Sequence, residues 1–138
     1  MDDPAPSEAG SPAHVLVAED HPVNRVVAQA MLASLGVGCS LAEDGLEAVQ
    51  CAASTAVDLI LMDLHMPLMD GLEATRWIRG ELQETFLPII AVTAGTMPSE
   101  IAGAKAAGCN DFINKPVTGA VLLTRMVQLI AQRETAPK

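Results

Sequence analysis

The stretch VDLILMDLHMPLMDG, residues 57–71, decides the fold class of this 138-residue chain. It opens with a mainly apolar run of strand length, as expected for a strand buried on both faces of a parallel sheet. Asp63 follows that run directly, and a loop then leads to Gly71, where a helix is predicted to begin. The stretch therefore predicts a buried strand that ends in a carboxylate, followed by a loop and a helix.

The same alternation of strand and helix is predicted along the rest of the chain. Strands are expected at residues 14–18, 37–42, 57–62, 88–92 and 111–113, and helices at 23–34, 45–53, 71–80, 98–107 and 117–132. Right-handed crossovers turn that order into a doubly wound parallel sheet with helices on both sides. The predicted fold class is thus α/β, with five parallel strands and five helices. One domain is expected over residues 13–132, between a flexible leader or linker at 1–12 and a flexible tail at 133–138.

Two of the predicted helices carry a prominent apolar face, and the sequence leaves the role of the second one open. In the first helix, one face is formed by residues that recur at helix spacing: Val23, Val26, Val27, Ala30, Met31 and Ser34. The last helix has a stripe of Ala120, Leu123, Val127 and Ile130, which Leu122, Met126 and Leu129 widen. That wide stripe is either a broad buried face or a surface for a partner or a second copy. The helix at 98–107 is expected to be the least stable, since it contains Gly103 and small residues that bury little.

Composition excludes several classes of partner. The formal net charge is -9, which argues against direct nucleic-acid binding and against docking on an anionic membrane. Cys39, Cys51 and Cys109 show no metal-ligand spacing and are expected to be reduced, buried thiols. No apolar run is long enough to span a bilayer, and no secretory signal pattern is present at the N-terminus. The expected location is cytoplasmic.

The polar residues that carry chemistry follow the predicted strands. They are Glu19 and Asp20 after the first strand, Asp63 after the third, Thr93 after the fourth and Lys115 after the fifth. Ligands bind at this edge of open α/β sheets, so these side chains are expected to converge. Three carboxylates with no suitably spaced His or Cys favour a hard cation, best Mg²⁺. A lysine and a hydroxyl beside them fit a site for phosphoryl transfer, with Asp63 as nucleophile.

Four motifs in register resemble response-regulator receiver domains. Residues 63–71 (DLHMPLMDG) resemble the phosphoacceptor loop of that family, and residues 15–20 (VLVAED) resemble its first strand with an acidic pair. Residues 91–94 (AVTA) and 114–116 (NKP) resemble the segments that carry the family's switch threonine and its lysine. The segment EDHPVNR at 19–25 is most similar to receivers at the C-terminus of hybrid histidine kinases, which implies that the chain is a piece of such a protein.

The resemblance implies a fold, a ligand set and a partner. The implied fold is flavodoxin-like with strand order 2-1-3-4-5. Mg²⁺ would be held by Asp20, Asp63 and the backbone carbonyl of His65, with Glu19 acting through water. Lys115 and Thr93 would contact the phosphoryl group, and Phe112 occupies the aromatic switch position.

The donor implied is a histidine kinase or a histidine phosphotransfer domain. The output would pass to a downstream protein or to fused domains, and a phosphorylation-dependent dimer is one form it could take. The chain would not be an enzyme beyond catalysing its own phosphorylation and dephosphorylation. Two departures from the family pattern are Glu19 in place of the commoner aspartate, and His65 where smaller or amide side chains are usual.

Three other functions remain open on the sequence alone. A pseudo-receiver would bind proteins without taking a phosphoryl group. A flavin mononucleotide carrier shares the topology, but its phosphate would meet Glu19 and Asp20. A phosphatase of the haloacid-dehalogenase type would need a second aspartate two residues after the nucleophile, where this chain has His65.

Overall fold

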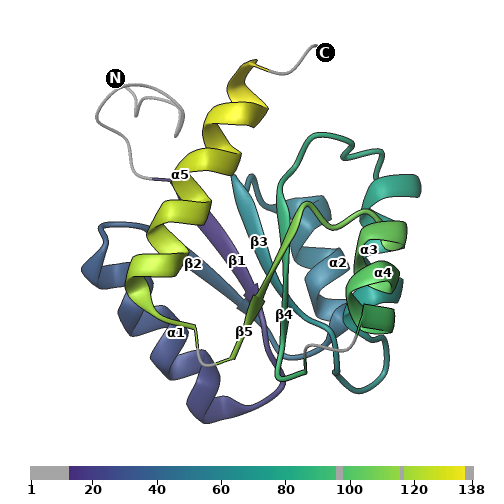
Figure 1. The fold of residues 1–138 in the computed structure, drawn as a ribbon, viewed down its shortest axis with the longest axis horizontal. Coiled ribbons are helices and arrows are strands. Elements are labelled where there is room, and N and C mark those ends of the chain that lie inside the picture. Colours follow the sequence, from purple (N-terminus) through teal and green to yellow (C-terminus); the bar gives the residue numbers. More distant parts are fainter. Residues whose placement is uncertain (1–12, 96–97, 116, 136–138) are drawn as a thin grey trace.

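A parallel sheet lies between two layers of helices (Figure 1). The structure is a computed structural model, and it describes residues 13–95, 98–115 and 117–135. Within these residues the strands run in the order β2-β1-β3-β4-β5. The strands are β1 His14–Ala18, β2 Gly38–Ala42, β3 Leu59–Asp63, β4 Ile89–Thr93 and β5 Asp111–Asn114. The helices are α1 Pro22–Ser34, α2 Gly45–Ser54, α3 Gly71–Gly80, α4 Pro98–Ala107 and α5 Gly119–Thr135. The predicted α/β class and the strand order are confirmed.

Side chains of the central strands divide alternately between two apolar cores, because successive residues of a strand point to opposite faces. Every residue of β3 and β4 is buried. One core lies under α1 and α5 and the other under α2, α3 and α4 (Figure 1). The strand residues of the first core are Val15, Val17, Leu59, Leu61, Ile90, Val92 and Ile113. Those of the second include Leu16, Ala18, Ile60, Met62, Ile89 and Ala91. Burial on both faces explains why these strands are continuous apolar runs.

The predicted apolar face of α1 is not the face that the helix buries. Val23, Val26 and Val27 are 61%, 64% and 52% exposed. The fully buried residue of α1 is Leu32, with Ala28 and Met31 partly buried beside it. Periodicity located the helix correctly, but the valines of the predicted face are exposed, because this helix has apolar residues on more than one face.

The last helix separates its apolar residues in a similar way. Leu122, Met126 and Leu129 are buried in the first core, whereas Leu123 and Val127 are 42% and 59% exposed. The interpretation of the whole stripe as one broad buried face is therefore wrong. The helix also runs to Thr135, three residues past its predicted end and into the segment expected to be a tail. Residues 1–12 of the predicted leader lie outside the described part of the chain.

Arg79 of α3 ties together two loops, α3–β4 and α4–β5, at the edge of the sheet opposite the carboxyl ends. Its guanidinium donates hydrogen bonds to the backbone carbonyls of Glu84, Leu87 and Gly108, at 2.6, 2.6 and 2.9 Å. A fourth bond of 2.7 Å reaches the Asn110 side-chain oxygen, which also accepts from the Ile89 backbone N–H. Burial lowers the pKa of Arg79, and the backbone carbonyls that accept its hydrogen bonds help to hold its charge.

Close packing around that guanidinium explains Gly108 at the end of α4. Its φ is +116°, a conformation that L side chains rarely adopt. A Cβ at this position would also lie 2.8 Å from Cγ of Arg79. The arginine and the glycine therefore fix the turn from α4 into β5, which sets the position of the strand that leads to Lys115.

Replacing Arg79 by methionine should destabilise the fold strongly. Methionine keeps the apolar stem but leaves the accepting carbonyls without a donor, so we expect a loss of about 3 kcal/mol in the free energy of unfolding. The matched control is Arg76→Met, an exposed arginine of the same helix, where we expect a change within about 0.5 kcal/mol. Urea unfolding followed by circular dichroism measures both. Equal midpoints for the two variants would show that Arg79 is not a structural tie.

Candidate functional site

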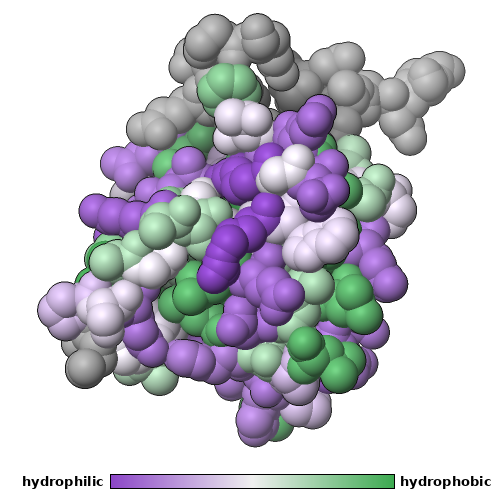
Figure 2. Space-filling view, turned by 90° about the vertical axis from the view of Figure 1, so that its right-hand side faces the viewer, coloured by the Kyte–Doolittle hydropathy of each residue, from purple (hydrophilic) through white to green (hydrophobic). Residues whose placement is uncertain are grey.

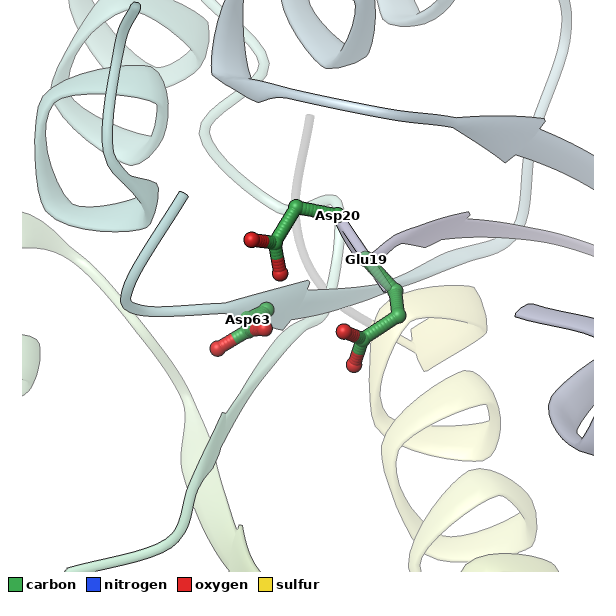
Figure 3. A group of neighbouring side chains, drawn as sticks. All are labelled: Glu19, Asp20 and Asp63. Atoms are coloured by element: carbon green, nitrogen blue, oxygen red, sulfur yellow. The ribbon is translucent and has the colours of Figure 1, made fainter. Parts of the chain in front are cut away.

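Three carboxylates meet at the carboxyl ends of β1 and β3. Glu19 and Asp20 follow β1, and Asp63 is the last residue of β3. One oxygen from each lies within 4.8 Å of the others, and Figure 3 shows the three side chains pointing toward a shared space. Asp63 and Glu19 are only 4% and 6% exposed, whereas Asp20 is exposed. The predicted acidic group is therefore formed.

Lys115 supplies the positive charge that this group needs. Its ammonium lies 3.1 Å from Oδ2 of Asp63 and 3.2 Å from Oε1 of Glu19. The residue follows β5, and its backbone N–H donates to the Thr93 carbonyl at 2.8 Å. This bond extends the pairing of β4 with β5 by one step and places the lysine over the carboxylates. Glu19 and Asp63 are 44 positions apart in sequence, and Asp63 and Lys115 are 52 positions apart. One ionic cluster thus joins three distant segments of the chain.

The charges of the site perturb one another. Burial raises the pKa of Asp63, and the neighbouring Glu19 carboxylate raises it further, against the lowering effect of Lys115 and of the His65 N–H. Burial also acts to raise the pKa of Glu19, but hydrogen bonds from His21, Lys115 and Asn24 outweigh it and the net pKa is lowered. Burial acts to lower the pKa of Lys115, yet its contacts with Asp63 and Glu19 raise it overall. The two buried carboxylates therefore compete for one ammonium.

Backbone geometry holds Asp63 in place from the loop that follows it. The His65 N–H donates to Oδ1 of Asp63 at 3.1 Å, and the Leu64 N–H donates to the Val92 carbonyl at 3.2 Å. A Cβ at Gly71 would lie 2.2 Å from the Asp63 carbonyl oxygen. Only glycine allows α3 to begin so close to the strand end. Asp70 caps that helix by accepting from the Glu73 N–H at 2.9 Å.

The turn after β1 fixes Glu19 in a comparable way. Its Oε2 accepts from the His21 N–H at 3.0 Å, and Arg25 of α1 donates to its backbone carbonyl at 2.8 Å. The Asn24 side chain is a further hydrogen-bond partner of Glu19. No role was assigned to Asn24 or Arg25 from the sequence, although both stand in the quoted EDHPVNR segment. Their nearness to the acidic pair was the available signal.

Thr93 ends β4, the strand that pairs with β3, but its hydroxyl bonds to a residue that the sequence did not single out. The side chain is buried, and its Oγ1 donates to Oε1 of Glu100 in the first turn of α4 at 3.0 Å. His65 Nε2 lies 2.9 Å from the other oxygen of Glu100. An acid in the first turn of a helix is usually explained by the helix dipole, so Glu100 gave no functional signal in the sequence.

Phe112, the predicted switch residue, lies on β5 opposite Ala91 of β4. It is half-buried and packs against the core under α2, α3 and α4. The side chain is therefore neither fully exposed nor fully enclosed. This position is compatible with a change of packing, but the predicted movement stays a prediction.

The donor set fits a hard divalent cation. Every candidate ligand is an oxygen, from Glu19, Asp20 and Asp63, and the exposure of Asp20 leaves the group open to solvent. Magnesium binds in proteins through one or two carboxylates together with water and phosphate oxygens. A cation would also relieve the repulsion that Lys115 alone balances. The chemistry of the residues thus accommodates Mg²⁺.

Within the described ranges, no helix is long and apolar enough to cross a membrane.

Comparison with known proteins gives a consistent result. A family model for the response regulator receiver domain matches residues 15–127. The two-component response regulator ORR41 of Oryza sativa subsp. japonica is 45% identical over 108 residues, covering 75% of this chain and 84% of the relative. The sensor histidine kinase RcsC of Salmonella typhimurium is 40% identical over 108 residues, covering 78% of this chain. The chain spans 11% of RcsC and 3% of hybrid signal transduction histidine kinase G from Dictyostelium discoideum.

Solved structures show the same likeness. The receiver domain of sensor histidine kinase PA1611 from Pseudomonas aeruginosa superposes with a TM-score of 0.82 at 39% identity, covering 88% of this chain and 99% of that one. That structure has a magnesium ion coordinated in its active site cleft. The receiver domain of Ssk1 from Saccharomyces cerevisiae, solved with the histidine phosphotransfer protein Ypd1, gives a TM-score of 0.81 at 27% identity. It covers 88% of this chain and 91% of that one.

Proposed function

The chain belongs to the response regulator receiver family, and on that premise we propose that Asp63 accepts a phosphoryl group from a phosphohistidine. The observation that carries the proposal is the placement of Asp63. It is a buried carboxylate at a strand end, held by Lys115 on one oxygen and by the His65 N–H on the other. Structural carboxylates are seldom buried beside two others of the same charge, whereas perturbed groups cluster at functional sites.

Transfer would proceed by in-line displacement at phosphorus. A carboxylate oxygen of Asp63 forms the new P–O bond while the P–N bond of the phosphohistidine breaks, and the electron pair of that bond stays on the departing imidazole. Lys115 keeps the carboxylate oriented and then faces the phosphoryl oxygens. The Thr93 hydroxyl is the second group able to donate to them once it leaves Glu100. The phosphoryl group adds about 1.5 to 2 negative charges. Lys115 and the Thr93 hydroxyl are the main groups with which the chain stabilises that charge.

Magnesium would be held by Asp20, Asp63 and the His65 backbone carbonyl, with Glu19 acting through water. When bound, it neutralises charge on the phosphoryl oxygens and on the carboxylates. The magnesium in the PA1611 receiver domain supports this assignment. Such a cation would relieve the repulsion among the three carboxylates, of which the Lys115 ammonium contacts two.

The alternatives fit this arrangement less well. A flavin mononucleotide phosphate would enter a cluster of three acids, which repels it. A phosphatase of the haloacid-dehalogenase type needs an acid at the position of His65, whose side chain instead pairs with Glu100. A pseudo-receiver would lack part of the acceptor set, yet Asp20, Asp63, Thr93 and Lys115 are all present at the site.

The exposed valines of α1 provide a docking surface for the phosphohistidine donor. Val23, Val26 and Val27 stand on the helix that begins two residues after Asp20. A helical partner packed on them would reach Asp63 with its imidazole. An apolar cavity of about 400 Å³ between α1 and α5 continues this surface, lined by Val27, Met31 and Leu122 among others. The pairing of Ssk1 with a histidine phosphotransfer protein supports a donor of this class.

The acceptor assignment is tested by phosphorylation with acetyl phosphate in the presence of Mg²⁺. The wild-type chain should gain one acid-labile phosphoryl group in intact-mass spectrometry. Asp63→Asn should gain none, because an amide is not a nucleophile. A mutant that is labelled as fully as the wild type would refute the assignment.

Magnesium should stabilise the fold through the same acidic group. At about 100 times its Kd, Mg²⁺ should add about 2.7 kcal/mol to the free energy of unfolding of the wild type. Asp20→Asn should lose most of this increment, whereas Glu81→Gln, which removes one charge at the far end of α3, should keep it. Chemical unfolding with and without Mg²⁺ makes the comparison. An unchanged increment in Asp20→Asn would exclude Asp20 as a ligand.

The docking surface predicts a difference between two phosphodonors. Val26→Lys should slow phosphoryl transfer from a phosphohistidine domain about tenfold, because an ammonium replaces an apolar contact. Its rate with acetyl phosphate, which needs no docking surface, should not change. The matched control is Val127→Lys on α5, where the valine is 59% exposed. If Val127→Lys slows the protein donor as much as Val26→Lys does, the donor does not dock on α1.

A further inference from the structure

Glu100 joins two elements across the mouth of the acceptor site. It stands in the first turn of α4 and accepts from the Thr93 hydroxyl, at the end of β4, through Oε1 at 3.0 Å. Its Oε2 lies 2.9 Å from Nε2 of His65, in the loop between β3 and α3. One carboxylate therefore holds both the predicted switch residue and a residue next to the acceptor.

The bond to Glu100 uses the only proton that the Thr93 hydroxyl can donate. A threonine hydroxyl has one donor and two acceptor positions. Here one acceptor position receives the Gly95 N–H at 3.1 Å, while the proton goes to Glu100. Thr93 is 2% exposed, so water does not replace these partners easily. Thr93 cannot donate to a phosphoryl oxygen until its bond to Glu100 breaks.

Packing around Glu100 shows that its carboxylate is seated rather than free on the surface. A Cβ at Gly95 would lie 3.0 Å from Oε1 of Glu100, so the carboxylate lies directly against the backbone of the β4–α4 loop. Two contacts, from His65 Nε2 and the Thr93 hydroxyl, hold its two oxygens.

The helix that carries Glu100 is weakly anchored. The buried residues of α4 are Ala104 and Ala107, both small. Little apolar burial therefore opposes a displacement of its first turn. Figure 2, which looks onto the side of the molecule formed by α3 and α4, shows polar side chains interspersed with small apolar patches over this face. A second negative charge beside Glu100 would repel it toward solvent on this side.

We propose that Glu100 is a positioning residue that holds the Thr93 hydroxyl away from the acceptor and competes with the phosphoryl group for it. This proposal rests on the assignment of Asp63 as acceptor. When Asp63 carries a phosphoryl group, its oxygens take the Thr93 proton and their charge repels the Glu100 carboxylate. The first turn of α4 is then released. The phosphoryl oxygens must therefore bind the Thr93 hydroxyl more strongly than Glu100 does before the switch changes.

The ordinary explanation of an acid at this place is stabilisation of a helix N-terminus by the helix dipole. That explanation predicts a slightly less stable α4 when Glu100 is removed, with no dependence on Thr93. Competition for one hydroxyl predicts a coupling between the two residues. A double-mutant cycle separates the two explanations.

The experiment measures the affinity for beryllofluoride, a mimic of the phosphoryl group, in the presence of Mg²⁺ by fluorine NMR. Wild type, Glu100→Ala and Glu100→Gln are compared, each also in a Thr93→Val background. Glu81→Ala serves as the control for loss of one negative charge. Circular dichroism establishes that each variant is folded, and Glu100→Gln remains informative if Glu100→Ala is not.

Glu100→Ala should bind beryllofluoride about fivefold more tightly than wild type, and Glu100→Gln should lie between the two. The gain should disappear in the Thr93→Val background, where no hydroxyl remains to be released. Glu81→Ala should match wild type. Unchanged affinity in Glu100→Ala and Glu100→Gln, or a gain that persists undiminished with Thr93→Val, would overturn the proposal. A wild-type chain that binds no beryllofluoride would instead refute the acceptor function itself, and the proposal with it.

Discussion

Repulsion among the carboxylates of Glu19, Asp20 and Asp63 is the constraint on which the rest of the site depends. Two of these groups are buried, and one ammonium, that of Lys115, lies close to both. Burying unequal charge costs free energy, and the backbone N–H groups of His21 and His65 offset part of this cost by donating to the two buried carboxylates. The same imbalance favours a divalent cation and a reaction in which negative charge is shared with it. The distances among these charged groups therefore determine both the stability of the site and the chemistry that it can perform.

Rigid and loosely held elements have separate tasks around this cluster. The central strands are buried on both faces, the His65 N–H holds Asp63, and Gly71 lets α3 start against the Asp63 carbonyl. These features fix the acceptor. Helix α4 is attached less firmly, since it buries only two alanines among its described residues. A change of charge at Asp63 would thus be transmitted by the elements that cost least to move.

The parts of the site that lie at strand ends were predictable from the sequence. Apolar runs locate buried parallel strands, and topology brings the residues after them to one edge, so Glu19, Asp63 and Lys115 could be grouped although they are far apart in the chain. Glu100 could not be found in this way, because its partners are decided by how α4 approaches β4. The exposed side of α1 could not be identified either. Its valines fit a helical period, but a helix with apolar residues on several faces does not reveal which of them the sheet covers.

The central claim is that the phosphoryl group is carried by Asp63, and locating the modified residue tests it most directly. Borohydride reduction of the phosphorylated chain converts an acyl phosphate of aspartate to homoserine, which tandem mass spectrometry of the proteolytic peptides can place. The account predicts homoserine at position 63 and at no other aspartate. Homoserine at Asp20, or a phosphoryl group that resists borohydride and stays on another type of side chain, would contradict it.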